Sequence, residues 1–393
     1  MKRYFSIFAA ALAMTLGTQA QEPQKPQEEQ KAQENKKAEN PKPEKPKGPE
    51  IEFFDAAQFP VYGKATQHTY ARYTRLPANY EQITRKDLWS LGLNSTGLYV
   101  RFRSNTQNMK IRWESWTGFR MNHMTDTGIR GIDVYTRDAK GNWVFLGCAR
   151  PSTKLETTSS VISDMDPGMR EYMVYLSLYD GVKKLEIGVD KGCIIEKSEL
   201  NSPKAGKPIV MYGTSILQGG CANRPGMVMT SILSRRLDRE VVNLGFSGNA
   251  RLDPDTAELM ASMEDPGIYV LDFTENNTAD GVRERLGKFV TILRQAHPDT
   301  PIVFVGCCLF NYARFSTKSM ESIKAVDAPV IAKYEEMRKA GDKNVYYVDG
   351  MILHGKDGEQ TIDSAHYTDV GMIRYADAME PILRKIMRKS KIK

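Results

Sequence analysis

Cysteine is scarce in this sequence, and its spacing fits neither a metal site nor a redox motif. The 393 residues include Cys148, Cys193, Cys221 and the adjacent Cys307 and Cys308. Structural zinc sites use paired cysteine or histidine ligands a few residues apart, and no such pairs occur. The odd number permits at most two disulfides, and we expect Cys307 and Cys308, which end an apolar segment, to be buried thiols. The sequence therefore predicts neither a bound metal nor redox chemistry.

Basic runs with interleaved aromatic residues are also missing. The net charge of +7 at pH 7 is mild for the length of the chain, so nucleic acid is not an expected partner. The loop Gly245–Gly248 follows an apolar segment but lacks the third glycine of a dinucleotide-binding fingerprint, so no cofactor is predicted. No segment resembles a lid or a long apolar tunnel for a fatty acyl chain. These patterns do not define an oligomeric state.

No apolar run suggests a membrane span. The run Phe5–Leu16 is too short to cross a bilayer, follows Lys2-Arg3, and is followed by small residues up to Ala20. This arrangement is typical of a secretory signal peptide, and we assign it to residues 1–20. No cysteine lies near the cleavage point, which argues against a lipid anchor. The mature protein is expected to begin near Gln21 and to be secreted or periplasmic.

The segment that follows, residues 21–50, has almost no large apolar residue. It is rich in Pro, Gln, Lys and Glu, and its seven Lys and seven Glu balance each other. Such a composition buries too little surface to offset the entropy lost on ordering. We expect a disordered linker here, ahead of two folded domains at residues 51–200 and 201–393.

Residues 51–200 are expected to form an antiparallel β-sandwich. Short segments in which apolar and polar residues alternate recur between turns rich in Asn, Gly and Asp, as is typical of sandwiches. These segments are 98–103, 109–113, 131–135, 143–146, 172–176 and 185–189.

Residues 201–393 instead alternate short apolar strands with longer helical patterns. This order predicts a doubly wound α/β domain with a mostly parallel sheet, in which a site lies beyond the carboxyl ends of the strands. The predicted strands are 208–213, 240–244, 267–273, 301–306 and 344–348, and the predicted helices are 226–238, 254–263, 280–296, 317–339 and 369–388.

Polar side chains follow several of these strands. Ser215 follows the first strand, a glycine-bearing loop ending at Gly248 follows the second, and Asn276 follows the third. Asp363 and His366 precede the last helix. A serine after a strand is often only a helix N-cap, so Ser215 becomes a candidate nucleophile because of the other residues gathered at strand ends.

Together these residues meet the needs of acyl transfer from an ester. A serine hydroxyl is a weak nucleophile at neutral pH, and the imidazole of His366 can accept its proton in the transition state. Asp363, three residues before His366, can turn back and hold the other ring nitrogen. The backbone of Ser215 and Gly248 and the amide of Asn276 can donate hydrogen bonds to the oxygen that becomes negative.

In chain order, these segments resemble the four blocks of the SGNH (GDSL-type) hydrolases. The blocks are Gly213-Thr214-Ser215, Asn243–Gly248, Asn276 and Asp363–His366. The segment Gly131–Tyr135 similarly resembles the Gly-x-Asp-Leu-Tyr motif of a sandwich domain that precedes one branch of this family.

The resemblance implies a three-layer, flavodoxin-like fold and assigns a role to each residue. Ser215 would be the nucleophile, His366 the base and Asp363 the residue that orients it. Ser215, Gly248 and Asn276 would form the oxyanion hole.

Two positions depart from the family pattern. Thr214 stands where the family usually has Asp, and Thr274–Asn277 stands where it usually has Gly-x-Asn-Asp. Asn277 therefore remains an alternative to Asn276 as oxyanion donor, and Glu275 beside the hole could alter substrate preference.

Other residues are secondary candidates. His123 lies in a loop of the sandwich and could reach the site across the domain junction, and Arg224 could contact a substrate hydroxyl or carboxylate. Both remain possible substrate contacts, whereas His354 is expected in an exposed loop. The role of the sandwich is left open between shaping the cleft, binding polysaccharide and mediating a dimer.

The sequence predicts a secreted serine esterase that hydrolyses small O-acyl esters, with acetyl esters of carbohydrate as the expected substrates. The expected partner is a small-molecule or glycan ester. Two alternatives stay open: a lipid or thioester hydrolase with the same residues, and a non-catalytic glycan-binding protein on a hydrolase scaffold.

Overall fold

The computed structural model describes residues 48–200 and 206–392. From Gly48 onward the chain forms one compact unit. The predicted signal peptide, and all but the last three residues of the predicted linker, lie outside the described residues. Across these two described ranges, no helix is long and apolar enough to cross a membrane.

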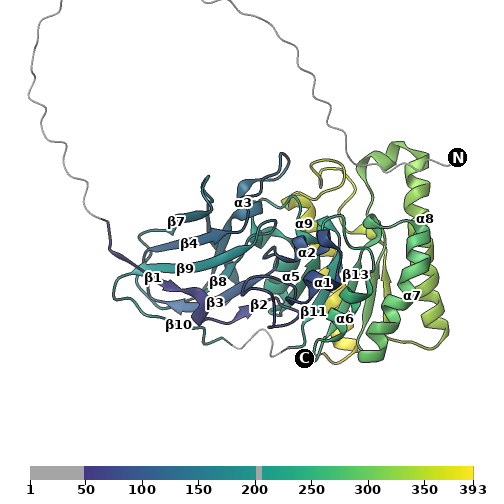
Figure 1. The fold of residues 1–393 in the computed structure, drawn as a ribbon, viewed down its shortest axis with the longest axis horizontal. Helices are drawn as coiled ribbons and strands as arrows, with labels where there is room; N and C mark the ends of the chain where they lie inside the picture. The colour runs from purple at the N-terminus through teal and green to yellow at the C-terminus, as the bar shows by residue number, and fades with distance from the viewer. Residues whose placement is uncertain (1–47, 201–205, 393) are drawn as a thin grey trace, which may run out of the picture. The chain divides into compact units, whose positions relative to one another are not determined.

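The first part of the unit contains two antiparallel sheets, and the predicted sandwich is confirmed (Figure 1). One sheet has the strand order β1 (Ile51–Asp55), β9 (Val182–Asp190), β4 (Met109–Ser115) and β7 (Glu156–Ile162). The other has the order β10 (Ile195–Lys197), β3 (Tyr99–Ser104), β8 (Arg170–Tyr175), β5 (Ile132–Arg137) and β6 (Trp143–Ala149), with β2 (Val61–Tyr62) also paired to β3.

Strand β4 shows how the alternating sequence makes this sandwich. Met109, Ile111 and Trp113 are buried, while Lys110 and Arg112 between them are partly exposed. Side chains alternate between the two faces of a strand, so one face joins the core and the other meets water. The hydrophobic effect therefore fixes the register, since a shift by one residue would exchange the two faces.

The second part of the unit is built on a parallel sheet, as predicted. Its strand order is β12 (Val241–Gly245), β11 (Ile209–Gly213), β13 (Ile268–Asp272), β14 (Ile302–Val305) and β15 (Val345–Val348). The chain turns to one side after β11 and crosses to the other side before β13. The carboxyl ends of β11 and β13 thus flank the topological switch point, where ligands bind in folds of this kind.

Helices cover both faces of the sheet because each strand buries residues on both sides. Ile209 and Met211 of β11 pack with α4 (Ser215–Gln218), α5 (Met229–Leu237) and α9 (Asp369–Lys389). Val210 and Tyr212 pack with α6 (Pro254–Ala261), α7 (Ala279–Ala296) and α8 (Thr317–Lys339).

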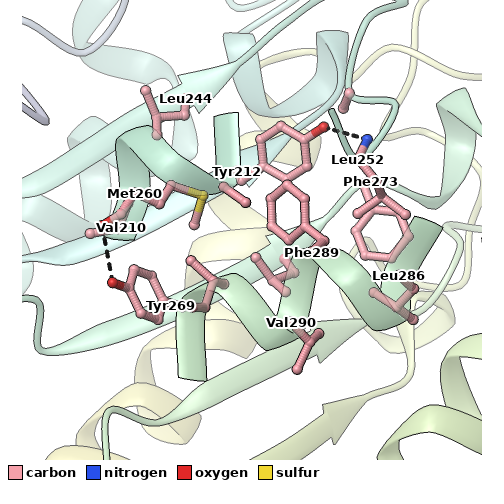
Figure 2. Close-up of a cluster of buried hydrophobic side chains, with 14 of the residues drawn as sticks. Val210, Tyr212, Leu244, Leu252, Met260, Tyr269, Phe273, Leu286, Phe289 and Val290 are labelled. Carbon is pink, nitrogen blue, oxygen red and sulfur yellow. Dashed lines mark hydrogen bonds between the residues drawn. The ribbon is translucent and has the colours of Figure 1, made fainter. Parts of the chain in front are cut away.

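Figure 2 shows the core on this second face. The Tyr212 ring stacks on Phe289 of α7 at 5.1 Å between centroids, and its hydroxyl accepts from the backbone of Leu252. Tyr269 is also held by its hydroxyl, which donates to the carbonyl of Met260. These two buried phenols thus each keep a hydrogen bond, which avoids the cost of a lost one.

One segment departs from the sandwich pattern. Residues 80–92 contain two short helices, α1 (Tyr80–Ile83) and α2 (Lys86–Gly92). Tyr80, Leu88 and Trp89 are buried in the core of the parallel sheet rather than in the sandwich. This part of the first domain therefore belongs to the second by its contacts. A further short helix, α3 (Asp126–Arg130), begins at Thr125, whose side chain accepts from Gly128 N–H.

Arg75 joins the two halves by hydrogen bonds to carbonyl oxygens. Its guanidinium donates to the carbonyls of Gly245 at 2.7 Å and Leu91 at 2.7 Å, and it lies over the ring of Phe246. Burial disfavours the charged form and lowers the pKa of Arg75 to about 9. All five cysteines are free, and Cys307 and Cys308 are buried, as predicted.

Candidate active site

Ser215 stands at the carboxyl end of β11, where strand gives way to helix. Gly213 ends the strand in a space that admits no side chain, because a Cβ there would lie 2.5 Å from the carbonyl oxygen of Asp272. Thr214 caps α4, and its side chain accepts from Ile216 N–H at 3.3 Å. The residue that replaces the family's usual Asp thus acts as an N-cap, and Ser215 is left as the first residue of the helix.

The structure brings Ser215, His366 and Asp363 together in one chain of hydrogen bonds. Ser215 Oγ lies 2.8 Å from His366 Nε2, and His366 Nδ1 lies 2.7 Å from Asp363 Oδ2. An ionised carboxylate can only accept, so the proton lies on Nδ1 and the lone pair of Nε2 faces the serine hydroxyl. This is the arrangement that serine hydrolysis requires.

A tight turn lets Asp363 reach the ring of His366. Ser364 has φ +73°, a left-handed conformation that reverses the chain. The second carboxylate oxygen of Asp363 accepts from the backbone N–H of His366 at 2.7 Å and of Ala365 at 3.1 Å. Partial burial alone would raise the pKa of Asp363, but the hydrogen bonds and charge of His366 outweigh it and lower the pKa below its ordinary value. Asp363 is therefore held ionised.

The loop after β12 is pinned beside the serine. Phe246 N–H donates to the carbonyl of Gly213 at 2.8 Å, and Ser247 N–H donates to Gln218 Oε1 at 2.8 Å. Gly248 follows with φ +68°, and a Cβ there would meet nothing within 4 Å. Within the described residues, the N–H groups of Ser215 and Gly248 have no hydrogen-bond acceptor, so both are available to a bound group.

The two asparagines after β13 differ in which atoms are free. Asn277 uses its side-chain NH₂ internally, donating to the carbonyls of Ala250 at 2.7 Å and Phe273 at 2.8 Å. Asn276 instead accepts from Ala250 N–H at 3.1 Å through Oδ1, which fixes its orientation. Its NH₂ group has no acceptor among the described residues, so of the two side-chain amides that of Asn276 is the one free to donate to a bound group.

A loop of the sandwich reaches the same place. The carboxylate of Asp180 accepts from the N–H groups of Thr117 at 3.1 Å and Gly118 at 2.8 Å, which holds the start of this loop. Further along, the ring of His123 lies 5.8 Å from that of His366 between centroids. His123, suggested from the sequence as a possible substrate contact, is thus beside the proposed base.

A cavity of about 410 Å³ lies between this loop, α2 and the loop that carries Gly248. Most of its lining comes from the N-terminal half of the chain. The lining residues are Asp87, Ser90, Leu91, Asn94, Thr117, Phe119, Met121, Tyr179, Ser247 and Asn249.

Tyr179 is a residue of this site that the sequence analysis missed. Its hydroxyl donates to the carbonyl of Ser215 at 3.1 Å from the opposite half of the molecule. Burial raises its pKa, so the phenol stays protonated and can donate. No local pattern signals such a contact, because the two residues are 36 positions apart and meet only through domain packing.

Arg224 is placed elsewhere, contrary to the suggestion of a substrate contact. Its guanidinium donates to Asp133 Oδ2 at 2.8 Å and to the hydroxyl of Tyr135 at 2.7 Å. Asp133 also accepts from Gly226 N–H at 2.8 Å. The Gly-x-Asp-Leu-Tyr-like segment therefore binds the loop after Ser215 to the sandwich. Arg224 lines a separate cavity of about 590 Å³ that shares no lining residue with the one lined by Tyr179.

Two further expectations are corrected by burial. His354, expected in an exposed loop, is fully buried, and its Nε2 accepts from Leu309 N–H at 3.1 Å. Burial lowers its pKa, which keeps the ring neutral. Glu275, expected beside the oxyanion hole, turns inward and accepts from Cys308 N–H at 2.9 Å. Burial raises the pKa of Glu275.

Comparison with known families agrees with the blocks read from the sequence. The model of the GDSL-like lipase/acylhydrolase family matches residues 206–384. A second model, for the N-terminus of SGNH hydrolase-type esterases, matches residues 51–195. Both resemblances drawn from the sequence are thereby confirmed. No curated protein matches the chain.

Solved structures extend the similarity over both halves. A protein from Bacteroides ovatus described as a GDSL-like lipase is 31% identical, with TM-score 0.81, and the match covers 88% of this chain and 99% of that one. A salicylyl-acyltransferase from a tetracycline biosynthetic pathway is 18% identical, with TM-score 0.68, over 86% of this chain and 97% of that one. A family two carbohydrate esterase from Cellvibrio japonicus is 13% identical, with TM-score 0.55, over 86% and 98%. The last two likenesses are of fold alone.

Proposed function

The chain belongs to the GDSL-like lipase/acylhydrolase family of serine ester hydrolases, and we propose that it is an exported esterase that removes small acyl groups, acetyl above all, from carbohydrate. The observation that carries this proposal is the hydrogen-bonded chain from Ser215 through His366 to Asp363, with distances of 2.8 and 2.7 Å. The roles proposed for the other residues follow from their positions around this chain of hydrogen bonds.

The reaction proceeds in two steps through an acyl-enzyme. His366 Nε2 takes the proton of Ser215 as Oγ attacks the ester carbonyl carbon, and Asp363 stabilises the imidazolium that forms. As the tetrahedral intermediate collapses, the bond to the alcohol breaks and His366 returns the proton to the leaving oxygen. Water then repeats the sequence on the Ser215 ester, which releases the carboxylic acid and restores the hydroxyl.

Three donors stabilise the oxyanion of each tetrahedral intermediate. They are the backbone N–H groups of Ser215 and Gly248 and the side-chain NH₂ of Asn276. All three lack an acceptor among the described residues, so no existing hydrogen bond must break when the charge develops. Preorganised donors of this kind are worth about 3 kcal/mol each in the transition state.

The cavity lined by Tyr179, whose hydroxyl contacts Ser215, supports a hydroxyl-rich alcohol. Asp87, Ser90, Asn94 and Thr117 are among the residues that line it, and Phe119, with 45% of its surface exposed, offers an apolar face. Sugars combine ring hydroxyls with an apolar face and suit such a mixture, whereas a long acyl chain would suit an apolar tunnel. The fold shared with a carbohydrate esterase agrees with this choice of substrate.

Export is proposed from the N-terminal sequence. Lys2-Arg3, the apolar run Phe5–Leu16 and the small residues up to Ala20 support cleavage near Gln21. Mass spectrometry of the protein recovered from the periplasm or medium tests this. A mature chain that still begins at residue 1 would contradict it.

The proposed activity is tested by acetate release from p-nitrophenyl acetate and from acetylated oligosaccharides. We expect wild type to act on both, Ser215→Ala on neither, and the matched surface variant Ser322→Ala to equal wild type, since Ser322 lies exposed on α8. Activity only on long-chain or thioester donors would favour the lipid or thioester alternative. A folded wild type that releases no acid and is not labelled by a fluorophosphonate would favour the glycan-binding alternative.

A further inference from the structure

We propose that His123, Asp363 and His366 form a binding site for a divalent transition-metal ion such as Zn²⁺, and that the bound ion switches the enzyme off. One nitrogen of each histidine and one carboxylate oxygen of Asp363 lie within 4.8 Å of one another. Ligand atoms around tetrahedral zinc are about 3.4 Å apart, so a modest rotation of the side chains closes the site. That part of the proposal stands on geometry and does not depend on turnover.

His123 is already oriented as a metal ligand. Its Nδ1 lies 3.0 Å from Oδ1 of Asn122, an oxygen that can only accept, so Nδ1 carries the proton. The lone pair of the neutral ring therefore lies on Nε2, which has no hydrogen-bond partner among the described residues. A histidine that donates its other ring N–H to an oxygen is the usual arrangement in metal sites, because this contact fixes both tautomer and orientation.

The other two ligands are accessible and suitably charged. The side chain of Asp363 is 38% exposed and that of His366 is 21% exposed, so an ion can enter from solvent. Asp363 supplies a full negative charge, and Oδ2 accepts only from His366, which leaves it capacity for an ion. Two imidazoles and one carboxylate with an open fourth position make a donor set that zinc accepts readily.

Metal binding at this site is incompatible with the proposed reaction. Asp363 Oδ2 lies 2.7 Å from Nδ1 of His366, on the far side of the ring from Nε2, so an ion that keeps Asp363 as a ligand binds Nδ1. There it takes the place of the proton shared with Asp363 and breaks the contact that orients the ring. The proton of the neutral ring then lies on Nε2, so the general base is lost. This regulatory consequence, unlike the binding, rests on the proposed function.

The sandwich therefore supplies a regulatory ligand as well as part of the cleft. His123 comes from a loop held by Asp180 of that domain, whereas Asp363 and His366 come from the loop before α9. Spacing in the sequence does not reveal the site, because His123 and Asp363 are 240 positions apart. Only the packing of the two halves brings the three ligands together.

The binding test uses a protein that cannot turn over. Calorimetric titration of ZnCl₂ into Ser215→Ala is compared with titration into Ser215→Ala/His123→Gln and into Ser215→Ala/His68→Gln. Loss of a first ligand should weaken binding by about tenfold or more, since even outer contacts of ligands are worth about 10–100-fold. His68 is an exposed histidine of the same half of the chain, so its variant should bind like the parent.

Inhibition is then measured on active protein. We expect Zn²⁺ to inhibit wild type reversibly, EDTA to restore activity, and His123→Gln to need at least about tenfold more Zn²⁺ than wild type or His68→Gln for the same fractional inhibition. Equal zinc affinity with and without His123 would overturn the site. Tight binding that leaves activity unchanged, or raises it, would overturn the switch. Absence of any esterase activity would refute the proposed function while leaving the binding result intact.

Discussion

Asp363 and Asp133 are both carboxylates that accept from a basic side chain, yet they lie in opposite environments. Asp363 faces His366 at a solvent-accessible edge, and the hydrogen bonds of its partner lower its pKa although partial burial opposes this. Asp133 faces Arg224 at the domain junction with its side chain fully buried. There burial outweighs the charge of Arg224, and the pKa of Asp133 is raised.

The difference separates a reactive contact from a structural one. A carboxylate at an accessible edge can stabilise a charge that appears and disappears, because water and backbone N–H groups keep it ionised. A buried carboxylate is strongly coupled to its single cationic partner, so the pair fixes two surfaces in place and is costly to break. Substitution at the edge should therefore change the rate, and substitution at the junction should change the stability.

The largest expected effect comes from the accessible carboxylate. Asp363→Asn should lower kcat by about 10⁴-fold, because the amide favours the wrong tautomer of His366. The melting temperature should stay close to that of wild type, since the side chain is 38% exposed. Steady-state kinetics and thermal unfolding of the same preparation measure both quantities.

Asp357→Asn is the matched control for this variant. Asp357 lies in the same C-terminal region and pairs with Arg374 at 2.6 Å, but it is 50% exposed and contacts no residue of the proposed triad. Its activity should equal that of wild type. A large decrease in the melting temperature of Asp363→Asn would instead mean that Asp363 has a structural role.

The two asparagines after β13 allow a similar comparison, between an amide proposed to act in the reaction and an amide proposed to stabilise the fold. Asn276→Ala should lower kcat by about 10²- to 10³-fold with little change in stability, because it removes an oxyanion donor that makes few internal contacts. Asn277→Ala should instead lower the free energy of unfolding by about 1–3 kcal/mol, since it removes two hydrogen bonds and leaves the carbonyl of Ala250 without this donor. The same kinetic and unfolding measurements, made in parallel, check this split. The reverse result would make Asn277 the oxyanion donor.

At the domain junction the expected loss is in stability. Asp133→Asn should lower the free energy of unfolding in urea by about 3–5 kcal/mol, because it leaves the guanidinium of Arg224 without its anionic partner. Removing both members in Asp133→Asn/Arg224→Met should recover part of this loss. Folded Asp133→Asn protein should keep kcat near that of wild type. A loss of kcat at unchanged stability would mean that the junction acts on the chemistry directly.

The smallest effect concerns a second buried carboxylate, Asp327. Burial raises its pKa to about 6, although Oδ1 accepts from Cys307 N–H at 2.7 Å. Between about pH 4 and pH 6 the unfolded chain releases this proton while the folded chain keeps it, so Asp327 costs stability as the pH rises through that range. Asp327→Asn cannot ionise and should gain on wild type by an amount on the order of 2 kcal/mol between pH 4.5 and 7.5. Urea unfolding at both pH values measures this, and a difference independent of pH would contradict it.

Much of the fold was predictable because its signals are local. Alternation of apolar residues located most of the longer sandwich strands, and the alternation of apolar strands with helical patterns located the parallel sheet and its five long helices. Segments such as α1 and α2 were not recognised, because their apolar residues face the core of the other half. Periodicity shows that a side chain is buried but not against which partner.

The residues of the site likewise fall into two groups, those that local sequence patterns indicate and those that only tertiary packing places. Five residues lie just before or after regular elements, in short sequence blocks that can be recognised, so the sequence alone identified them as candidates for the site. They are Ser215, Gly248, Asn276, Asp363 and His366. Tertiary structure decided that Asn276 and not Asn277 keeps a free NH₂, and that Arg224 is engaged by Asp133. It also placed Tyr179 beside Ser215 and His123 beside His366. The physical reason is that hydrogen bonds between residues far apart in sequence depend on how two independently patterned halves pack, which no local pattern records.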